Sequence, residues 1–260
     1  MLSMKPKLNG IWSTGANFRL YLSSQPSGST QEAVLRPWFG SQPGRYVNIP
    51  DVHSPQLGND RHLVVYLPPS WDENPYIHYD LIIAQDGQNL FNDSTAFGGV
   101  SWRCDRTIDD LVREGKMREL VMVGVDNTGA NRINEYTYSA DPKYGDILTH
   151  HTFCLIFTHD LPKCKRSLDT SRLISGGGKA ALYLRFLRET VLPLIGKSFS
   201  RADGDVSVLG SSLGGLFACW AAWTHPQVFS SAVCMSSSFW WNKNDFNRTS
   251  FSSIRCIGHI

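Results

Sequence analysis

The 260-residue sequence has no long hydrophobic run. No stretch approaches the roughly 20 apolar residues that cross a bilayer. Residues 1–22 also lack the uninterrupted apolar core of a secretory signal. We therefore expect a soluble, cytoplasmic protein that does not bind membranes.

The sequence also lacks an excess of charge of either sign. It contains 25 Lys and Arg against 23 Asp and Glu, which gives a formal net charge of +2. Such a balance argues against nucleic acid or an anionic membrane surface as a partner.

Closely spaced cysteine pairs are absent as well. The six cysteines include no CxxC motif, which predicts free, partly buried thiols in an intracellular chain. One segment gathers His150, His151, Cys154, His159 and Cys164, but its two cysteines do not pair at the close spacing typical of zinc sites. We expect no metal and no cofactor, and a metal site in that segment is the less favoured alternative.

From residue 44 onward, apolar strands alternate with amphipathic helices. Strands are predicted at 45–49, 62–71, 80–85, 120–127, 205–210 and 229–238, and helices at 106–116, 179–195 and 213–226. This order predicts an α/β fold with a mainly parallel central sheet and helices on both faces. Residues 1–43 are polar and rich in Ser, Gly and Pro, so we expect an N-terminal extension followed by one domain over 44–260.

The segment 210–214 reads Gly-Ser-Ser-Leu-Gly and fits the G-x-S-x-G motif, with Ser212 at its centre. A tight turn from strand to helix requires small residues, here Gly210 and Gly214, and it lifts the central serine clear of the sheet. The predicted strand before it and helix after it favour a nucleophile elbow. The alternative is a helix-capping turn made of Gly and Ser.

A serine that attacks an acyl group needs hydrogen-bond donors for the oxyanion that forms. One is the backbone N–H of Leu213, at the start of the helix after Ser212. The loop 85–89 follows an earlier strand, and the amide of Gln88 is the best second donor there, because Gly87 allows the backbone to turn. Asp86-Gly87 can equally be a simple tight turn.

Over roughly residues 45–242 the chain resembles the putative esterase family, which includes the enterochelin esterases and is related to esterase D and the antigen 85 acyltransferases. The resemblance rests on an ordered set of motifs: DRHLVVYLPPSWDENP, IIAQDGQNLFND, VGVDNTGANRINEYTYSADP, GGGKAALYLRFLRETVLPLI and GSSLGGLFACWAAWTHPQVFSSAVCMSSSFWW. It implies an α/β-hydrolase fold and serine carboxylic-ester hydrolysis. Ser212 would be the nucleophile, and the Gln88 and Leu213 amides would form the oxyanion hole.

The resemblance includes another family signature, made of Asn127, Arg132, Glu135 and Tyr136. In it we interpret Arg132 and Glu135 as an ion pair that fixes a loop. The chain departs from the family by an apparent insertion at about 146–175, which we interpret as a surface loop.

A second departure follows Ser212, where the only acidic residue is Asp245 and the only histidines are His225 and His259. We assign neither the catalytic acid nor the base to any of them, and we interpret the chain as truncated, with later strands of the fold missing. The strand at 229–238 would then be an apolar sheet edge.

Two functional hypotheses follow. The first is a serine esterase that acts on a small-molecule ester through an acyl-enzyme on Ser212. The alternative is a catalytically silent binding or regulatory isoform, or a non-functional truncated product. The oligomeric state is not predicted.

Overall fold

The computed structural model describes residues 2–8, 11–13, 18–20, 43–141, 144 and 176–248. Its contacts divide the chain into two compact units. The first consists of Met1–Val52, His62–Asp126 and Leu194–Ser207, and the second of His53–Arg61, Asn127–Pro193 and Val208–Ile260.

The predicted N-terminal extension contains two short antiparallel strand pairs. Strand β1 (Leu2–Met4) pairs with β4 (Phe18–Leu20), and β2 (Lys7–Leu8) pairs with β3 (Ile11–Trp12). Residues 21–42 lie outside the described part of the chain.

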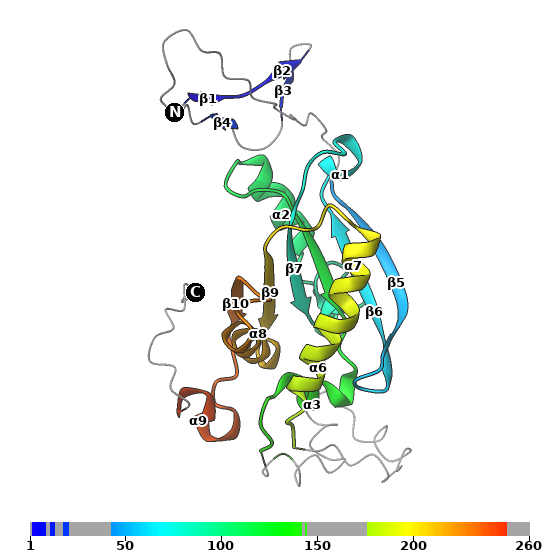
Figure 1. Ribbon diagram of the computed structural model, residues 1–260, viewed down its shortest axis with the longest axis vertical. Coiled ribbons are helices and arrows are strands. Elements are labelled where there is room, and N and C mark those ends of the chain that lie inside the picture. Colours follow the sequence, from blue (N-terminus) through cyan, green and yellow to red (C-terminus); the bar gives the residue numbers. More distant parts are fainter. Residues whose placement is uncertain are drawn as a thin grey trace. The chain divides into compact units, whose positions relative to one another are not determined.

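The main sheet contains six strands in the order β10-β9-β7-β8-β6-β5, with β10 (Ser231–Met235) at one edge (Figure 1). Their bounds are β5 Arg45–Ser54, β6 Asn59–Leu67, β7 Asp80–Gln85, β8 Leu120–Val125 and β9 Val206–Ser211. Strand β8 pairs in parallel with β7 and antiparallel with β6. All six residues of β8 are buried, as expected for a strand covered on both faces.

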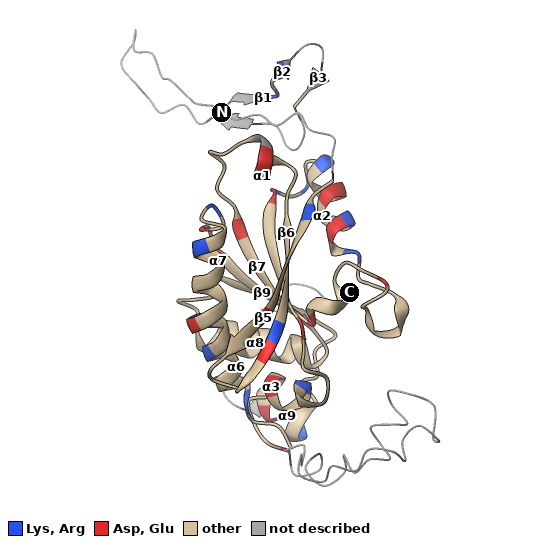
Figure 2. Ribbon diagram, turned by 90° about the vertical axis from the view of Figure 1, so that its right-hand side faces the viewer, with Lys and Arg blue, Asp and Glu red and all other residues tan. Residues whose placement is uncertain are grey.

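Short helices connect these strands. They are α1 (Ser70–Glu73), the 3₁₀ turns Gly87–Asn89 and Phe97–Gly99, and α2 (Cys104–Arg113). Helix α2 buries Ile108 and Val112 and ends before Gly115, whose φ of 71° is the left-handed conformation that glycine adopts after a helix. Figure 2 shows acidic and basic residues interspersed along α2.

One long helical segment begins in the second unit and has a register change that the sequence pattern did not predict. Helix α6 (Ala180–Phe186) continues through a π-helical turn (Leu187–Val191) into α7 (Leu192–Ser198). A regular helical spacing that continues from the buried Leu187 and Val191 would place Leu194 in the core, but Ile195 is the fully buried residue. The π turn adds a residue to one turn, so the next core position moves along the chain by one.

The remaining elements of this unit surround the predicted elbow. They are a 3₁₀ turn (Gly129–Asn131), α3 (Arg132–Tyr136), α8 (Leu213–Thr224), β10 (Ser231–Met235) and α9 (Trp241–Arg248). Strand β10 hydrogen-bonds to β9. Its side chains Val233 and Met235 are 43% and 37% exposed. Tyr136, Tyr183 and Phe217 pack together in the core, with ring centroids 4.9 to 6.0 Å apart.

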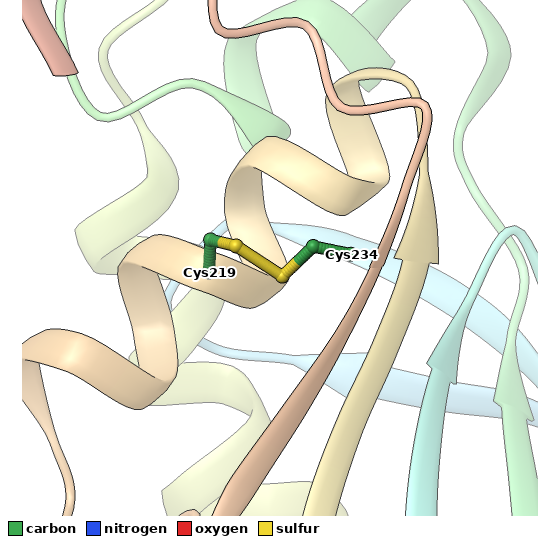
Figure 3. The surroundings of a disulfide bond; sticks show 2 residues. All are labelled: Cys219 and Cys234. Atoms are coloured by element: carbon green, nitrogen blue, oxygen red, sulfur yellow. A yellow bond between two sulfur atoms is a disulfide. The ribbon is translucent and has the colours of Figure 1, made fainter. Parts of the chain in front are cut away.

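The prediction of free thiols is wrong for two cysteines. Cys219 on α8 and Cys234 on β10 form a disulfide across the helix and the strand (Figure 3). They are 15 residues apart in sequence, and no spacing motif marks them. Cys104 is a free thiol, and burial raises its pKa to about 11.

The residues that flank the predicted insertion are neighbours. The Asp141 N–H donates a hydrogen bond of 2.7 Å to the Gly176 carbonyl, and Ala140 forms a β-bridge with Gly177. The segment 146–175 itself, with its histidines and cysteines, lies outside the described residues.

Candidate active site

Ser212 occupies the turn between β9 and α8, with Ser211 as the last residue of the strand and Leu213 as the first of the helix. Its φ of 57° and ψ of −120° lie in a region that non-glycine residues rarely adopt. The residue is exposed, whereas Leu213 is buried. The backbone therefore presents the Ser212 hydroxyl at the surface in a strained conformation.

Gly210 makes this turn sterically possible. A Cβ atom added at Gly210 would lie 2.2 Å from the carbonyl oxygen of Gly214, far inside van der Waals contact. The first turn of α8 packs directly on the end of β9, so glycine at position 210 has no substitute.

The elbow is hydrogen-bonded to the end of β10 and to the segment that follows it. The Ser212 N–H donates to the Met235 carbonyl at 3.0 Å, and the Ser238 N–H donates to the Ser212 carbonyl at 3.0 Å. The Oγ atoms of Ser212 and Ser238 are 3.1 Å apart. Arg132 reaches the other side of the turn, where its guanidinium donates to the Ser211 carbonyl at 3.4 Å.

The loop that carries Gln88 follows β7 in the first unit, whereas Ser212 and Leu213 belong to the second. Asp86 is buried and takes the left-handed conformation, with φ of 58°, and Gly87–Asn89 forms a 3₁₀ turn. The Thr95 hydroxyl, which is not part of this 3₁₀ turn, donates a hydrogen bond of 2.8 Å to the Gln88 carbonyl and so stabilises the turn.

Gly87 is needed for a different reason from the one that the sequence indicated. The backbone turns at Asp86, and a Cβ atom at Gly87 would lie 2.6 Å from the Gly124 carbonyl carbon and 2.7 Å from Asp126 Oδ1. Close packing of the loop on β8 therefore requires glycine there.

A cavity of about 110 Å³ adjoins this loop within the first unit, and Gly87, Gln88 and Phe91 form part of its wall. His62 and Asp126 also line it, with His62 Nδ1 3.1 Å from Asp126 Oδ2. No local pattern marks this pair, because His62 lies on β6 and Asp126 directly follows β8, 64 residues further along the chain.

The candidates for an acid and a base have other roles or lie outside the described residues. His225 is the C-cap of α8, about 20 Å along the helix from Ser212. Its ring contacts the Thr224 hydroxyl at 2.9 Å, and burial followed by the charge of Arg188 lowers its pKa. His259 is not described.

Asp245 lies in α9 and anchors that helix. Its carboxylate accepts hydrogen bonds from the Tyr138 hydroxyl, from Ser139 Oγ at 2.5 Å and from Asn242 Nδ2 at 2.9 Å. Burial and the bond to Asp245 raise the pKa of Tyr138. These contacts explain Asp245 as a structural residue.

Glu135 has an ion-pair partner that the sequence analysis missed. Its carboxylate lies 2.7 Å from the Arg61 guanidinium, and both side chains are at most 2% exposed. Burial acts to lower the pKa of Arg61, but Tyr183 and Glu135 outweigh it and leave that pKa raised. The proposed pairing of Glu135 with Arg132 overlooked Arg61 because Arg61 lies on a distant strand, β6.

Within the described ranges, no group of three or more His, Cys, Asp or Glu side chains is arranged to hold a metal ion. No helix in the same ranges is both long enough and apolar enough to span a bilayer.

Comparison with solved structures identifies the fold. An IroE-like serine hydrolase from Shewanella oneidensis is 20% identical, with a TM-score of 0.56 over 78% of this chain and 54% of its own. The siderophore hydrolase EstA from Aspergillus nidulans is 19% identical, with a TM-score of 0.55 over 84% of this chain and 65% of its own. The chain therefore has the α/β-hydrolase fold.

Sequence relatives cover different shares of the chain. The uncharacterized protein YbbA of Bacillus subtilis is 24% identical over 190 residues, 72% of this chain and 61% of its own length. The siderophore enterobactin esterase of Emericella nidulans is 40% identical over 67 residues, 25% of this chain and 22% of its own. The chain thus spans about three fifths of YbbA and a smaller part of the siderophore esterase.

The model of the family described as Putative esterase matches residues 54–150 and 164–254. The two matched segments include the loop with Gln88, the elbow at Ser212 and the strand that leads to Ser238. The interruption falls inside the predicted insertion. This chain belongs to the Putative esterase family.

Proposed function

We propose that this chain is a serine carboxylic-ester hydrolase that works through an acyl-enzyme on Ser212. The observation that carries the proposal is the strained, exposed Ser212 between β9 and α8. Backbone strain of this kind persists where it serves a function, and a nucleophile elbow needs it to present the hydroxyl.

In the proposed reaction, Ser212 Oγ attacks the carbonyl carbon of the ester and its proton passes to a general base. The C–O bond to the alcohol then breaks, and the alcohol leaves with that proton while the acyl group stays on Oγ. Water next attacks the acyl-enzyme and releases the acid. We assign the base to none of the described residues.

We propose the backbone N–H groups of Leu213 and Gln88 as the oxyanion donors. Leu213 begins a 12-residue helix, where the helix dipole favours negative charge. Gln88 lies in a 3₁₀ turn that Thr95 and the packing of Gly87 hold in place. In other enzymes, loss of one such donor lowers kcat by about 10² to 10³-fold.

We propose a small-molecule ester as the substrate, and siderophore esters as the first compounds to assay. The support is the similarity of a quarter of the chain to proteins named as siderophore esterases from two fungi. Simple acyl esters and carbohydrate-linked esters belong in the same assay panel.

The cytoplasmic location stays a prediction, and the Cys219–Cys234 disulfide weighs against it, because disulfides rarely persist in the cytosol. The redox state of Cys219 and Cys234 in the cell tests this location. Free thiols are alkylated at the moment of cell lysis, and peptide mapping then shows which cysteines were modified. Reduced Cys219 and Cys234 would support the cytoplasm, and oxidised ones an oxidising compartment.

A fluorophosphonate probe tests the nucleophile. We expect the folded chain to be labelled, the heat-denatured chain not to be, and the labelled peptide to contain Ser212. Ser212→Ala should abolish labelling, while Ser211→Ala should keep it. Absence of labelling in a folded wild-type chain would reject the esterase proposal and favour the silent alternative.

A further inference from the structure

We infer that Ser238 is a positioning residue for Ser212: its buried hydroxyl holds the Ser212 Oγ atom in the orientation from which it attacks. This inference rests on the proposed function of Ser212 as the nucleophile. Ser238 lies in the segment Ser236–Ser238 that follows β10, and no motif in the sequence separates it from the other two serines.

The first observation is the contact between the two hydroxyl groups. Ser212 Oγ and Ser238 Oγ are 3.1 Å apart, within hydrogen-bond distance, and Ser238 is 3% exposed. In the part of the chain that the structure describes, Ser238 is the only side-chain partner of Ser212 Oγ. A buried hydroxyl without a partner is unfavourable, so this pairing has a physical cause.

The second observation is the backbone frame that holds the two serines together. The Ser238 N–H donates to the Ser212 carbonyl, and the Ser212 N–H donates to the Met235 carbonyl, each at 3.0 Å. The Trp241 N–H donates to the Ser238 carbonyl at 3.0 Å and fixes the other side of Ser238. Both Cα positions are therefore set by hydrogen bonds that do not depend on the Ser238 hydroxyl, so removing that hydroxyl leaves the frame intact.

The hydroxyl of Ser238 can act in two ways. As an acceptor, it receives a hydrogen bond from the Ser212 hydroxyl and so selects one of the three staggered positions of Oγ. As a donor, it stabilises the negative charge that builds up on Ser212 Oγ while the base removes its proton. Both ways make attack faster, and in both Ser238 acts through Ser212 without touching the substrate.

Three variants separate this role from simple support of the turn. Ser238→Ala removes the hydroxyl, Ser238→Thr keeps it, and Ser237→Ala removes the adjacent hydroxyl, for which the structure gives no contact with Ser212 Oγ. For each variant, the second-order rate constant of fluorophosphonate labelling is measured together with the melting temperature.

We expect Ser238→Ala to slow labelling by roughly 5- to 100-fold, the range from a neutral to a charge-assisted hydrogen bond. Ser238→Thr should recover most of the rate, and Ser237→Ala should label like the wild type. Wild-type labelling rates in Ser238→Ala would overturn the inference. Equal slowing in Ser238→Ala and Ser237→Ala would overturn it too, because the turn as a whole would then be responsible.

A crystal structure of Ser238→Ala tests the inference with a measurement that does not depend on the reactivity of Ser212. We expect Ser212 Oγ to leave the position that it has beside Ser238, and an unchanged position would refute the positioning role. If the folded wild type is not labelled at all, the esterase proposal is rejected. The crystal structure of Ser238→Ala still shows whether Ser238 positions the Ser212 hydroxyl.

Discussion

The Cys219–Cys234 disulfide gives a prediction whose size follows from the fold. It closes a loop whose ends are 15 residues apart, and that loop contains the second half of α8 and most of β10 (Figure 3). Closing such a loop in the unfolded chain removes conformational entropy worth about 3 kcal/mol at 25 °C.

The perturbation is Cys234→Ser. This change breaks the bond and leaves the buried sulfur of Cys219 in place, so that the core loses no atom next to α8. We expect the free energy of unfolding to fall by about 3 kcal/mol. With an m-value of about 2 to 3 kcal/mol per molar urea, the midpoint should fall by about 1 to 1.5 M.

Urea unfolding followed by circular dichroism measures the midpoint, and Cys104→Ser is the control because Cys104 is a free thiol. Peptide mapping after alkylation under denaturing conditions, without a reductant, provides the direct test. Alkylation of both Cys219 and Cys234 in the wild type would refute the disulfide, and an unchanged midpoint in Cys234→Ser would refute its stabilising role.

Two further predictions concern buried groups. Glu135→Gln should cost about 3 to 5 kcal/mol in urea unfolding, because it leaves the charge of Arg61 buried without its ion-pair partner. Arg185→Gln, which breaks an exposed pair with Glu189, should cost less than about 1 kcal/mol, and equal costs would contradict the reasoning. Cys104 should contribute stability below about pH 9 that is lost as the pH rises towards 11, because the folded state keeps the thiol protonated after the unfolded chain ionises. Urea midpoints of wild type and Cys104→Ala from pH 8 to 11 measure this loss, and identical pH profiles would exclude it.

Much of the secondary structure could be predicted because it depends on neighbours in the sequence. The apolar run 80–85 is strand β7 with the same bounds, and the helix predicted at 179–195 corresponds to α6 to α7, which run from Ala180 to Ser198. The π turn at Leu187–Val191 escaped prediction, since a regular period of 3.6 residues fits the pattern almost as well.

The candidate site was predictable only in part. Ser212 and Gly210 belong to one short motif, and the tight turn that requires glycine at position 210 involves only residues 210–214. The sequence could therefore indicate the nucleophile. Ser238, 26 residues away, could not be found in the same way, because it meets Ser212 only after β10 has paired with β9.

The sequence by itself determined the order of the six strands of the main sheet and of the three longest helical segments, the family and the serine that most resembles a nucleophile, since each is encoded in local patterns of apolar, small and polar residues. Only the tertiary structure decided which groups surround them. It pairs Glu135 with Arg61, links Cys219 to Cys234, assigns Asp245 to the anchoring of α9 and requires Gly87 for its packing on β8. The physical reason is the same in each case: strand pairing and helix packing bring together residues that are distant along the chain, and no local pattern specifies such contacts.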